Sequence, residues 1–201
     1  MPRQSKADKE LAAIDALEDA LFGAYRDALP GEDGAFALAL SQATLKSSAN
    51  YERLAKRHGL TANGLMLLIT LRFAEAPCTQ RLVSKLLWLP KQTVGSIVAS
   101  LKKRGLITEA PSPADGRAKV LALTDEGARL CDTAVTELVS LEHTALEALP
   151  PEDVSVTVRT LDAYVETFER GLDDLQTLKR SDGTTGAQRE RTVNITAARR
   201  E

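Results

Sequence analysis

The stretch Lys91–Gly127 reads KQTVGSIVASLKKRGLITEAPSPADGRAKVLALTDEG, and its first part follows a helical hydrophobic period. The apolar residues of this period share one face of a helix predicted over 91–104, and they are Val94, Ile97, Val98 and Leu101. The outer side carries only short or hydrogen-bonding side chains, where an ordinary solvated face would be richer in Glu and Lys. This outer side carries Gln92, Ser96, Ala99 and Lys103, with Thr93 and Ser100 beside it. The candidates for hydrogen bonding along the helix are Lys91, Gln92, Thr93, Ser96 and Ser100.

After Gly105 the hydrophobic period changes from that of a helix to that of a strand. Leu106–Thr108 and Val120–Leu123 are predicted to pair as a β-hairpin, because the turn-forming run 111–117 separates them. Thr124 and the two acids behind it are then predicted to cap a long helix.

Two further helices precede this hairpin. Thr61 and Thr79 are suitable N-caps for them, and Pro90 suits the first turn of the helix 91–104. In the helix that starts after Thr79, the residues expected to face the core are Leu82, Val83, Leu86 and Leu87. The order helix, helix, turn, helix, β-hairpin over 61–123 predicts a mainly α-helical winged helix-turn-helix with a small β-hairpin wing.

The charge of this segment differs from that of the rest of the chain. Residues 79–119 contain eight Lys and Arg but only two acids, Glu109 and Asp115, so their net charge is +6 while the whole chain carries −2. A basic patch on an acidic body is typical of a phosphate-binding module. A B-DNA major groove admits one helix, which predicts that the helix 91–104 contacts bases. Arg117 at the hairpin tip suits the more electronegative minor groove.

Length and composition exclude several classes of protein. The 201 residues are 43% hydrophobic and 27% charged, as in a globular chain, and the eight aromatic residues favour a helical core. Two cysteines are too few for a disulfide framework or a four-ligand zinc site, and they fit a reducing cytosol. Because there is neither an 18-residue apolar run nor a secretory signal, we expect a cytoplasmic protein without a membrane partner. No motif indicates an enzyme, a cofactor or a metal site, and His58 and His143 are too few and too far apart to hold a metal.

Three runs resemble the MarR family of bacterial transcriptional regulators: Gln92–Ile107, Asp115-Gly116-Arg117, and Leu121–Gly127. The Asp-x-Arg of the wing followed by Leu-Thr-x-x-Gly is the most specific part of a resemblance that covers roughly residues 35–178. The resemblance implies a homodimer, held by its first and last helices, that binds a pseudo-palindromic operator in double-stranded DNA, more often as a repressor. By position, Arg117 resembles the wing arginine that enters the minor groove, and Asp115 resembles the acid that orients the wing.

These inferences divide the chain into five parts. They are an N-terminal helical extension (1–33), a dimerisation helix (34–60), the winged-helix lobe (61–123), C-terminal dimerisation helices (124–178) and a disordered tail (179–201). Neither the extension, with a helix predicted over Lys6–Leu29, nor the tail has a counterpart in the family core.

The predicted DNA-contacting residues are Lys91, Gln92, Thr93, Ser96, Ser100, Lys102, Lys103, Arg104, Asp115, Arg117 and Lys119.

The run Thr108–Ala110 departs from the MarR pattern, because family members often carry a basic residue just after the Gly-Leu-Ile strand, which is Gly105–Ile107 in this sequence. Here Glu109 stands near the expected phosphates. It would weaken DNA binding unless it points away or pairs with a neighbour.

Few residues are candidates for binding a regulatory ligand or for sensing oxidation. Tyr51 and His58 lie seven residues apart on one helix face, and Trp88 precedes Lys91–Ser100, which by position resembles the recognition helix of the family. The resemblance implies a cleft there for a small aromatic or anionic ligand, and ordinary hydrophobic packing is the alternative. Cys78, and with less reason Cys131, is either a redox-sensing thiol or a small buried hydrophobe.

Two alternatives to a ligand-released DNA-binding regulator therefore remain. One is a cysteine-based redox-sensing regulator on the same scaffold. The other is a helical interaction protein that does not bind DNA.

Overall fold

The computed structural model describes residues 12–13, 16–17, 20, 22–23, 28–29, 31–111 and 118–181. The helix predicted over Lys6–Leu29 lies largely outside these residues, and the wing tip around Arg117 and the tail after Ser181 lie wholly outside them. The chain divides into two compact units, Met1–Ser140 and Leu141–Glu201, and each is described by itself.

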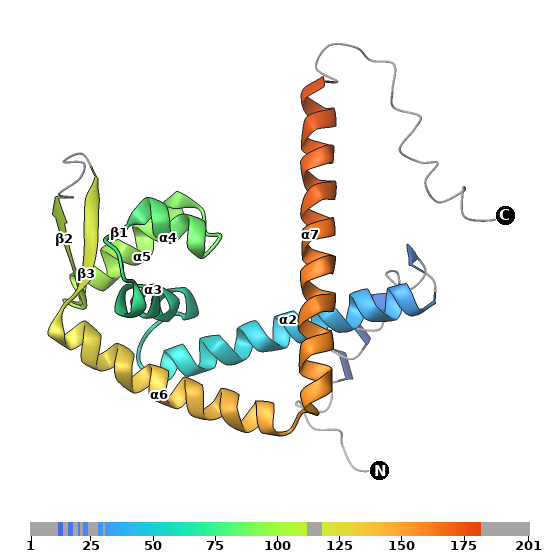
Figure 1. The fold of residues 1–201 in the computed structure, drawn as a ribbon, viewed down its shortest axis with the longest axis horizontal. Coiled ribbons are helices and arrows are strands. Elements are labelled where there is room, and N and C mark those ends of the chain that lie inside the picture. The colour runs from blue at the N-terminus through green and yellow to red at the C-terminus, as the bar shows by residue number, and fades with distance from the viewer. Residues whose placement is uncertain are drawn as a thin grey trace. The chain divides into compact units, whose positions relative to one another are not determined.

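Two helices of the first unit, α2 and α3, are joined by a tight turn (Figure 1). Helix α2 spans Glu32–Arg57 and α3 spans Ala62–Phe73. Between them Gly59 has a φ of 66°, a left-handed conformation that glycine adopts without the steric cost of a Cβ atom. Thr61 caps α3 by accepting a hydrogen bond from the Gly64 N–H at 3.1 Å, which confirms the predicted N-cap.

The helix-turn-helix consists of α4, Gln80–Leu86, and α5, Lys91–Lys103. The Thr79 side chain caps α4 by accepting a hydrogen bond from the Leu82 N–H at 3.3 Å, as predicted. The turn between the helices passes through Trp88, whose φ of 49° is unusual for a bulky side chain.

Three short antiparallel strands complete the lobe: β1 (Cys78–Thr79), β2 (Ile107–Pro111) and β3 (Lys119–Leu123). They form one sheet in the order β1-β3-β2, and β2 and β3 make the predicted hairpin. The sequence did not predict β1, because a strand of two residues shows no alternation.

One apolar cluster holds the lobe together, with contributions from α2, α3, α4, α5, the sheet and α6 (Asp125–Glu147). Its largest fully buried side chains are Leu65, Leu67, Leu68, Val83, Val94 and Cys131. The predicted inner face of α5 is confirmed, since Val94, Val98 and Leu101 are buried and Ile97 is half-buried.

The start of α6 lies very close to the junction of α5 and β2. The Thr124 hydroxyl donates a hydrogen bond to the Gly105 carbonyl oxygen at 2.7 Å and accepts one from the Gly127 N–H at 3.0 Å. A Cβ atom on Gly127 would lie only 1.9 Å from the carbonyl oxygen of Leu106. The Leu-Thr-x-x-Gly sequence therefore has a structural reason: its threonine bridges two elements and its glycine allows their backbones to touch.

The predicted inner face of α4 is partly wrong. Val83 is buried and Leu87 half-buried, but Leu82 is 50% exposed and Leu86 is 59% exposed. The helical period places these apolar residues correctly on the helix, but a helix of seven residues packs only one narrow side against the lobe.

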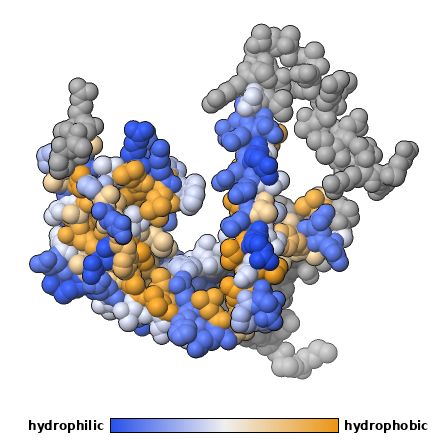
Figure 2. All heavy atoms as spheres, viewed as in Figure 1, coloured by the Kyte–Doolittle hydropathy of each residue, from blue (hydrophilic) through white to orange (hydrophobic). Residues whose placement is uncertain are grey.

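The second unit contains the end of α6 and the long helix α7, Pro151–Ser181. Apolar side chains recur between charged ones along α7 (Figure 2). Those with at least a third of their surface exposed include Val158, Tyr164, Val165, Phe168, Leu172 and Leu175. Among the described residues, no helix has both the length and the apolar character needed to cross a membrane.

Replacing Gly127 with Ala should lower the free energy of unfolding by about 1–3 kcal/mol, because the added Cβ forces the α6 backbone away from Leu106. Urea unfolding followed by circular dichroism measures this loss. Gly95→Ala is the control, since its Cβ would meet nothing closer than 3.8 Å and Ala favours a helix over Gly. If Gly127→Ala is as stable as the parent, the close packing at this junction is refuted.

Candidate nucleic-acid interface

Burial of one side of α5 determines which of its side chains face solvent. With Val94 and Val98 in the core, the opposite side points outward. The residues exposed there are Lys91, Gln92, Ser96 and Ser100, and Thr93 beside them is half-buried. The Ser96 hydroxyl donates to the Gln92 carbonyl oxygen at 3.1 Å, so its oxygen can still accept a hydrogen bond from a base. No Asp or Glu occurs in α5, so this face repels no phosphate.

Three predicted phosphate-contacting cations, Lys102, Lys103 and Arg104, lie exposed at the C-terminal end of α5, but they differ in their partners. Arg104 donates from Nη1 to the Gly59 carbonyl oxygen at 2.6 Å, which ties the end of α5 to the α2–α3 turn. Lys102 forms an ion pair with Glu109, whereas Lys103 has no ion pair among the described residues. Only Lys103 is therefore wholly available to a phosphate.

Glu109, which departs from the MarR pattern, pairs with its neighbours. Its carboxylate accepts hydrogen bonds from the Lys102 ammonium and from Gln80 Nε2, the latter at 3.0 Å, and Lys119 Nζ lies 3.9 Å away. The hydrogen bond from Lys102 lowers the pKa of Glu109, although burial alone would raise it. The carboxylate is therefore ionised and neutralised in place.

The predicted wing residues are only partly described. Lys119 lies exposed on β3, whereas Asp115 and Arg117 lie outside the described residues. The roles of these two in the wing remain predictions.

A groove of about 540 Å³ separates α5 from the α2–α3 turn, and Ser96, Ser100 and Arg104 line one side of it. Glu52 of α2 lines it as well and accepts a hydrogen bond from the Ala62 N–H at 2.8 Å, which satisfies the first turn of α3. The sequence did not predict this contact, because only the reversal of the chain after α2 brings Glu52 to α3.

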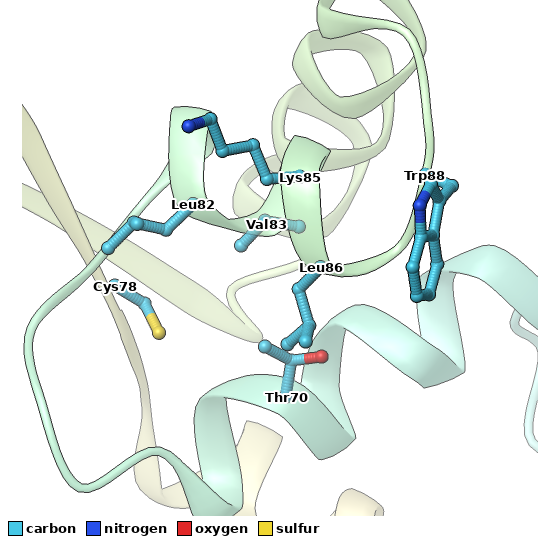
Figure 3. A pocket seen from close by; sticks show the side chains of 7 residues that line it. All are labelled: Thr70, Cys78, Leu82, Val83, Lys85, Leu86 and Trp88. Carbon is cyan, nitrogen blue, oxygen red and sulfur yellow. The ribbon is translucent and has the colours of Figure 1, made fainter. Parts of the chain in front are cut away.

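The residues considered for a small-molecule site lie in two places. Trp88, 83% exposed, lines a mostly apolar pocket of about 410 Å³ (Figure 3). The other lining residues are Thr70, Cys78, Leu82, Val83, Lys85 and Leu86. Neither Tyr51 nor His58 lines this pocket, and His58 Nε2 instead lies 3.3 Å from a carboxylate oxygen of Glu137 on α6.

Neither cysteine has the environment of a reactive thiol. Burial raises the pKa of Cys78, which lies half-buried in β1. Burial also raises the pKa of Cys131, in the core, to about 11. Redox-sensing thiols have lowered pKa values and are accessible, so these surroundings favour the structural interpretation of both residues.

The sequence of residues 58–118 matches the family model for the MarR family. The match runs from the end of α2 through the helix-turn-helix and β2, and it confirms the resemblance for this part of the chain. No curated protein sequence matches the chain.

Solved structures of MarR-family proteins share the fold. A transcriptional regulator from Rhodococcus sp. RHA1 aligns with a TM-score of 0.57 at 22% identity, covering 67% of this chain and 95% of its own. CouR from Rhodococcus jostii RHA1, bound to p-coumaroyl-CoA, gives 0.57 at 24% identity, with 64% and 90% covered. MepR from Staphylococcus aureus, in complex with DNA, gives 0.58 at 20% identity, with 63% and 96% covered. At these identities the alignments establish a winged-helix fold.

In the folded protein at pH 8, we expect Cys131 to react with a disulfide reagent such as DTNB at least about a hundredfold more slowly than in urea, because a pKa of about 11 leaves roughly one thiol in a thousand ionised. Cys78→Ser and Cys131→Ser assign the two reactions, and the same variants in urea serve as controls. Fast labelling of either thiol in the folded state would restore the redox-sensing alternative.

Proposed function

We propose that this chain, whose residues 58–118 match the MarR family, is a homodimeric, sequence-specific DNA-binding regulator of transcription that acts in the cytoplasm. The observation that carries the proposal is the exposed face of α5, which is polar, free of acids and followed by cations. Such a helix suits the major groove, where the pattern of donors and acceptors distinguishes all four base pairs.

The exposed side chains of α5 and the wing have different roles in DNA binding. Gln92, Thr93 and Ser96 contact base edges, because their amide and hydroxyl groups both donate and accept hydrogen bonds. Lys91 and Lys103 contact phosphates and set the position of the helix without reading sequence. Arg117 enters the adjacent minor groove, where the negative potential is strongest.

The homodimer is supported by the exposed apolar face of α7. Leu161, which is half-buried, and the exposed Tyr164, Phe168, Leu172 and Leu175 recur at intervals of three and four residues, which places them along one side of the helix. The Tyr164 and Phe168 rings stack with their centroids 6.2 Å apart. A second copy of the chain covers this face, and the resulting two-fold symmetry places two recognition helices about 34 Å apart, one turn of B-DNA.

Release of DNA by a ligand is the regulatory part of the proposal. One structural neighbour, CouR, is a transcriptional repressor solved both on a 23-mer DNA duplex and with p-coumaroyl-CoA. In this chain the pocket beside Trp88 offers an apolar surface to an aromatic ligand, and Lys85 offers a cation to an anionic one. A ligand that binds one spacing of the two lobes better than another shifts the population away from the DNA-competent form and releases the DNA. That the protein acts as a repressor follows from the habit of the family that it resembles.

The probe is a DNA duplex that the parent protein selects from a randomised library. Replacing Arg117 with Ala should weaken binding to this duplex by on the order of 1–3 kcal/mol, because a minor-groove contact is lost. Fluorescence anisotropy over a salt series measures it, and binding should weaken steeply as salt rises. Lys46→Ala, an exposed cation on α2, is the control. Selection of no duplex even in dilute buffer would favour the interaction protein that does not bind DNA.

A charge placed on the α7 face should dissociate the dimer. Phe168→Asp puts an unpaired carboxylate in the proposed interface and should raise the dimer dissociation constant by at least about tenfold. Analytical ultracentrifugation measures the dissociation, and Glu169→Gln, one residue along the helix, is the matched control. A parent that sediments as a monomer, or a Phe168→Asp dimer as tight as the parent, would refute this interface.

A further inference from the structure

We propose that Glu109 is a positioning residue for DNA recognition, which fixes the base of the wing against α4 and α5 and thereby removes Lys102 from the set of phosphate contacts. This inference rests on the proposed function. It adds a residue that the family resemblance marked only as a departure.

The contacts of Glu109 join four elements of the lobe. Glu109 itself lies on β2, and its donors come from the first residue of α4 (Gln80), the last turn of α5 (Lys102) and the start of β3 (Lys119). Its side chain is only 9% exposed. A carboxylate with so little access to water is stable only when its partners stay in place, so these donors hold the wing base in one orientation.

The same contacts change the role of Lys102. Its side chain is 41% exposed, but its ammonium group is hydrogen-bonded to Glu109 at the surface of the lobe. To neutralise a phosphate instead, Lys102 would leave Glu109 poorly compensated, and the free energy gained outside would be offset by that loss. The neighbouring Lys103 is exposed and has no such partner among the described residues, so it is the matched comparison.

Another role for Glu109 makes the opposite prediction. If Glu109 only reduces the positive charge of the lobe, removing its charge should strengthen binding to every DNA sequence equally. If it positions the wing, removing its charge should weaken binding to the selected sequence while binding to unrelated DNA is unchanged or stronger. The ratio of the two affinities separates these roles.

The experiment compares Glu109→Gln, Lys102→Met, the double variant and Lys103→Met. The probes are a duplex selected by the parent from a randomised library and a scrambled duplex of equal length, each titrated over a salt series. We expect Glu109→Gln and Lys102→Met each to lower the selected-to-scrambled affinity ratio about tenfold, and the double variant to be no worse than either, because both break one contact. Lys103→Met should weaken both duplexes equally and reduce the salt slope by about one phosphate.

Either of two DNA-binding results would overturn the proposal. One is a rise in affinity for both duplexes in Glu109→Gln. The other is a Lys102→Met variant that behaves like Lys103→Met in its affinities and its salt slope. Glu75→Gln, an exposed acid between α3 and β1, controls for the change in net charge.

Amide hydrogen exchange, measured without DNA, tests whether Glu109 holds the base of the wing in place. This test does not depend on the proposed function. In Glu109→Gln, the amides of residues 107–110 and 119–123 should exchange faster than in the parent, while those of α7 are unchanged. If the parent selects no duplex but exchange in the wing strands is faster in Glu109→Gln, the proposed function fails, whereas the conclusion that Glu109 holds the base of the wing is supported. If exchange in the wing strands is unchanged, the positioning role fails whatever the DNA results.

Discussion

Val94, Val98 and Leu101 hold one side of α5 in the core of the winged-helix lobe, and the candidate interface depends on that burial. Because each residue of a helix is rotated by a fixed angle from the last, burying these three also determines that Gln92 and Ser96 face outward. The contact of Gly127 with Leu106 adds a second constraint, since it keeps the end of α5, the start of β2 and the start of α6 together. Helix α5 and the base of the β2–β3 hairpin are thus parts of one packed body.

The sequence predicted those parts of the fold that local patterns specify. The helical period places α5 to within one residue at its end, and the predicted caps Thr61 and Thr79 form their hydrogen bonds. The same period misplaced Leu82 and Leu86, because apolar spacing does not tell whether a face meets its own core or another surface. The partners of Glu109 come from three separate elements, so no local pattern could predict them. The open question raised by its sequence, whether this acid pairs or points away, needed the tertiary structure.

The exposed apolar residues form surfaces of different shape in the two units, and each shape suits a different binding partner. Around Trp88 the first unit forms a concave pocket, with a strained backbone that holds a large aromatic side chain in solvent. Along α7 the apolar residues form an extended stripe instead. A pocket of about 410 Å³ fits a small molecule, whereas a stripe repeating every three to four residues fits another helix. In the proposed function, the pocket binds the effector and the stripe binds the second copy of the chain.

The net charge of +6 over residues 79–119 counts every Lys and Arg equally. The structure distinguishes these cations by the protein groups that they contact. Lys102 is held by Glu109, and Arg104 uses one of its donors on Gly59 while keeping others free. Long-range attraction to DNA depends on the sum of these charges, whereas discrimination between sequences depends on how firmly the reading groups are placed. A lysine that is paired with an acid of its own lobe therefore contributes to the placement of the wing, and the salt dependence of DNA binding depends only on the cations that remain free to meet phosphates.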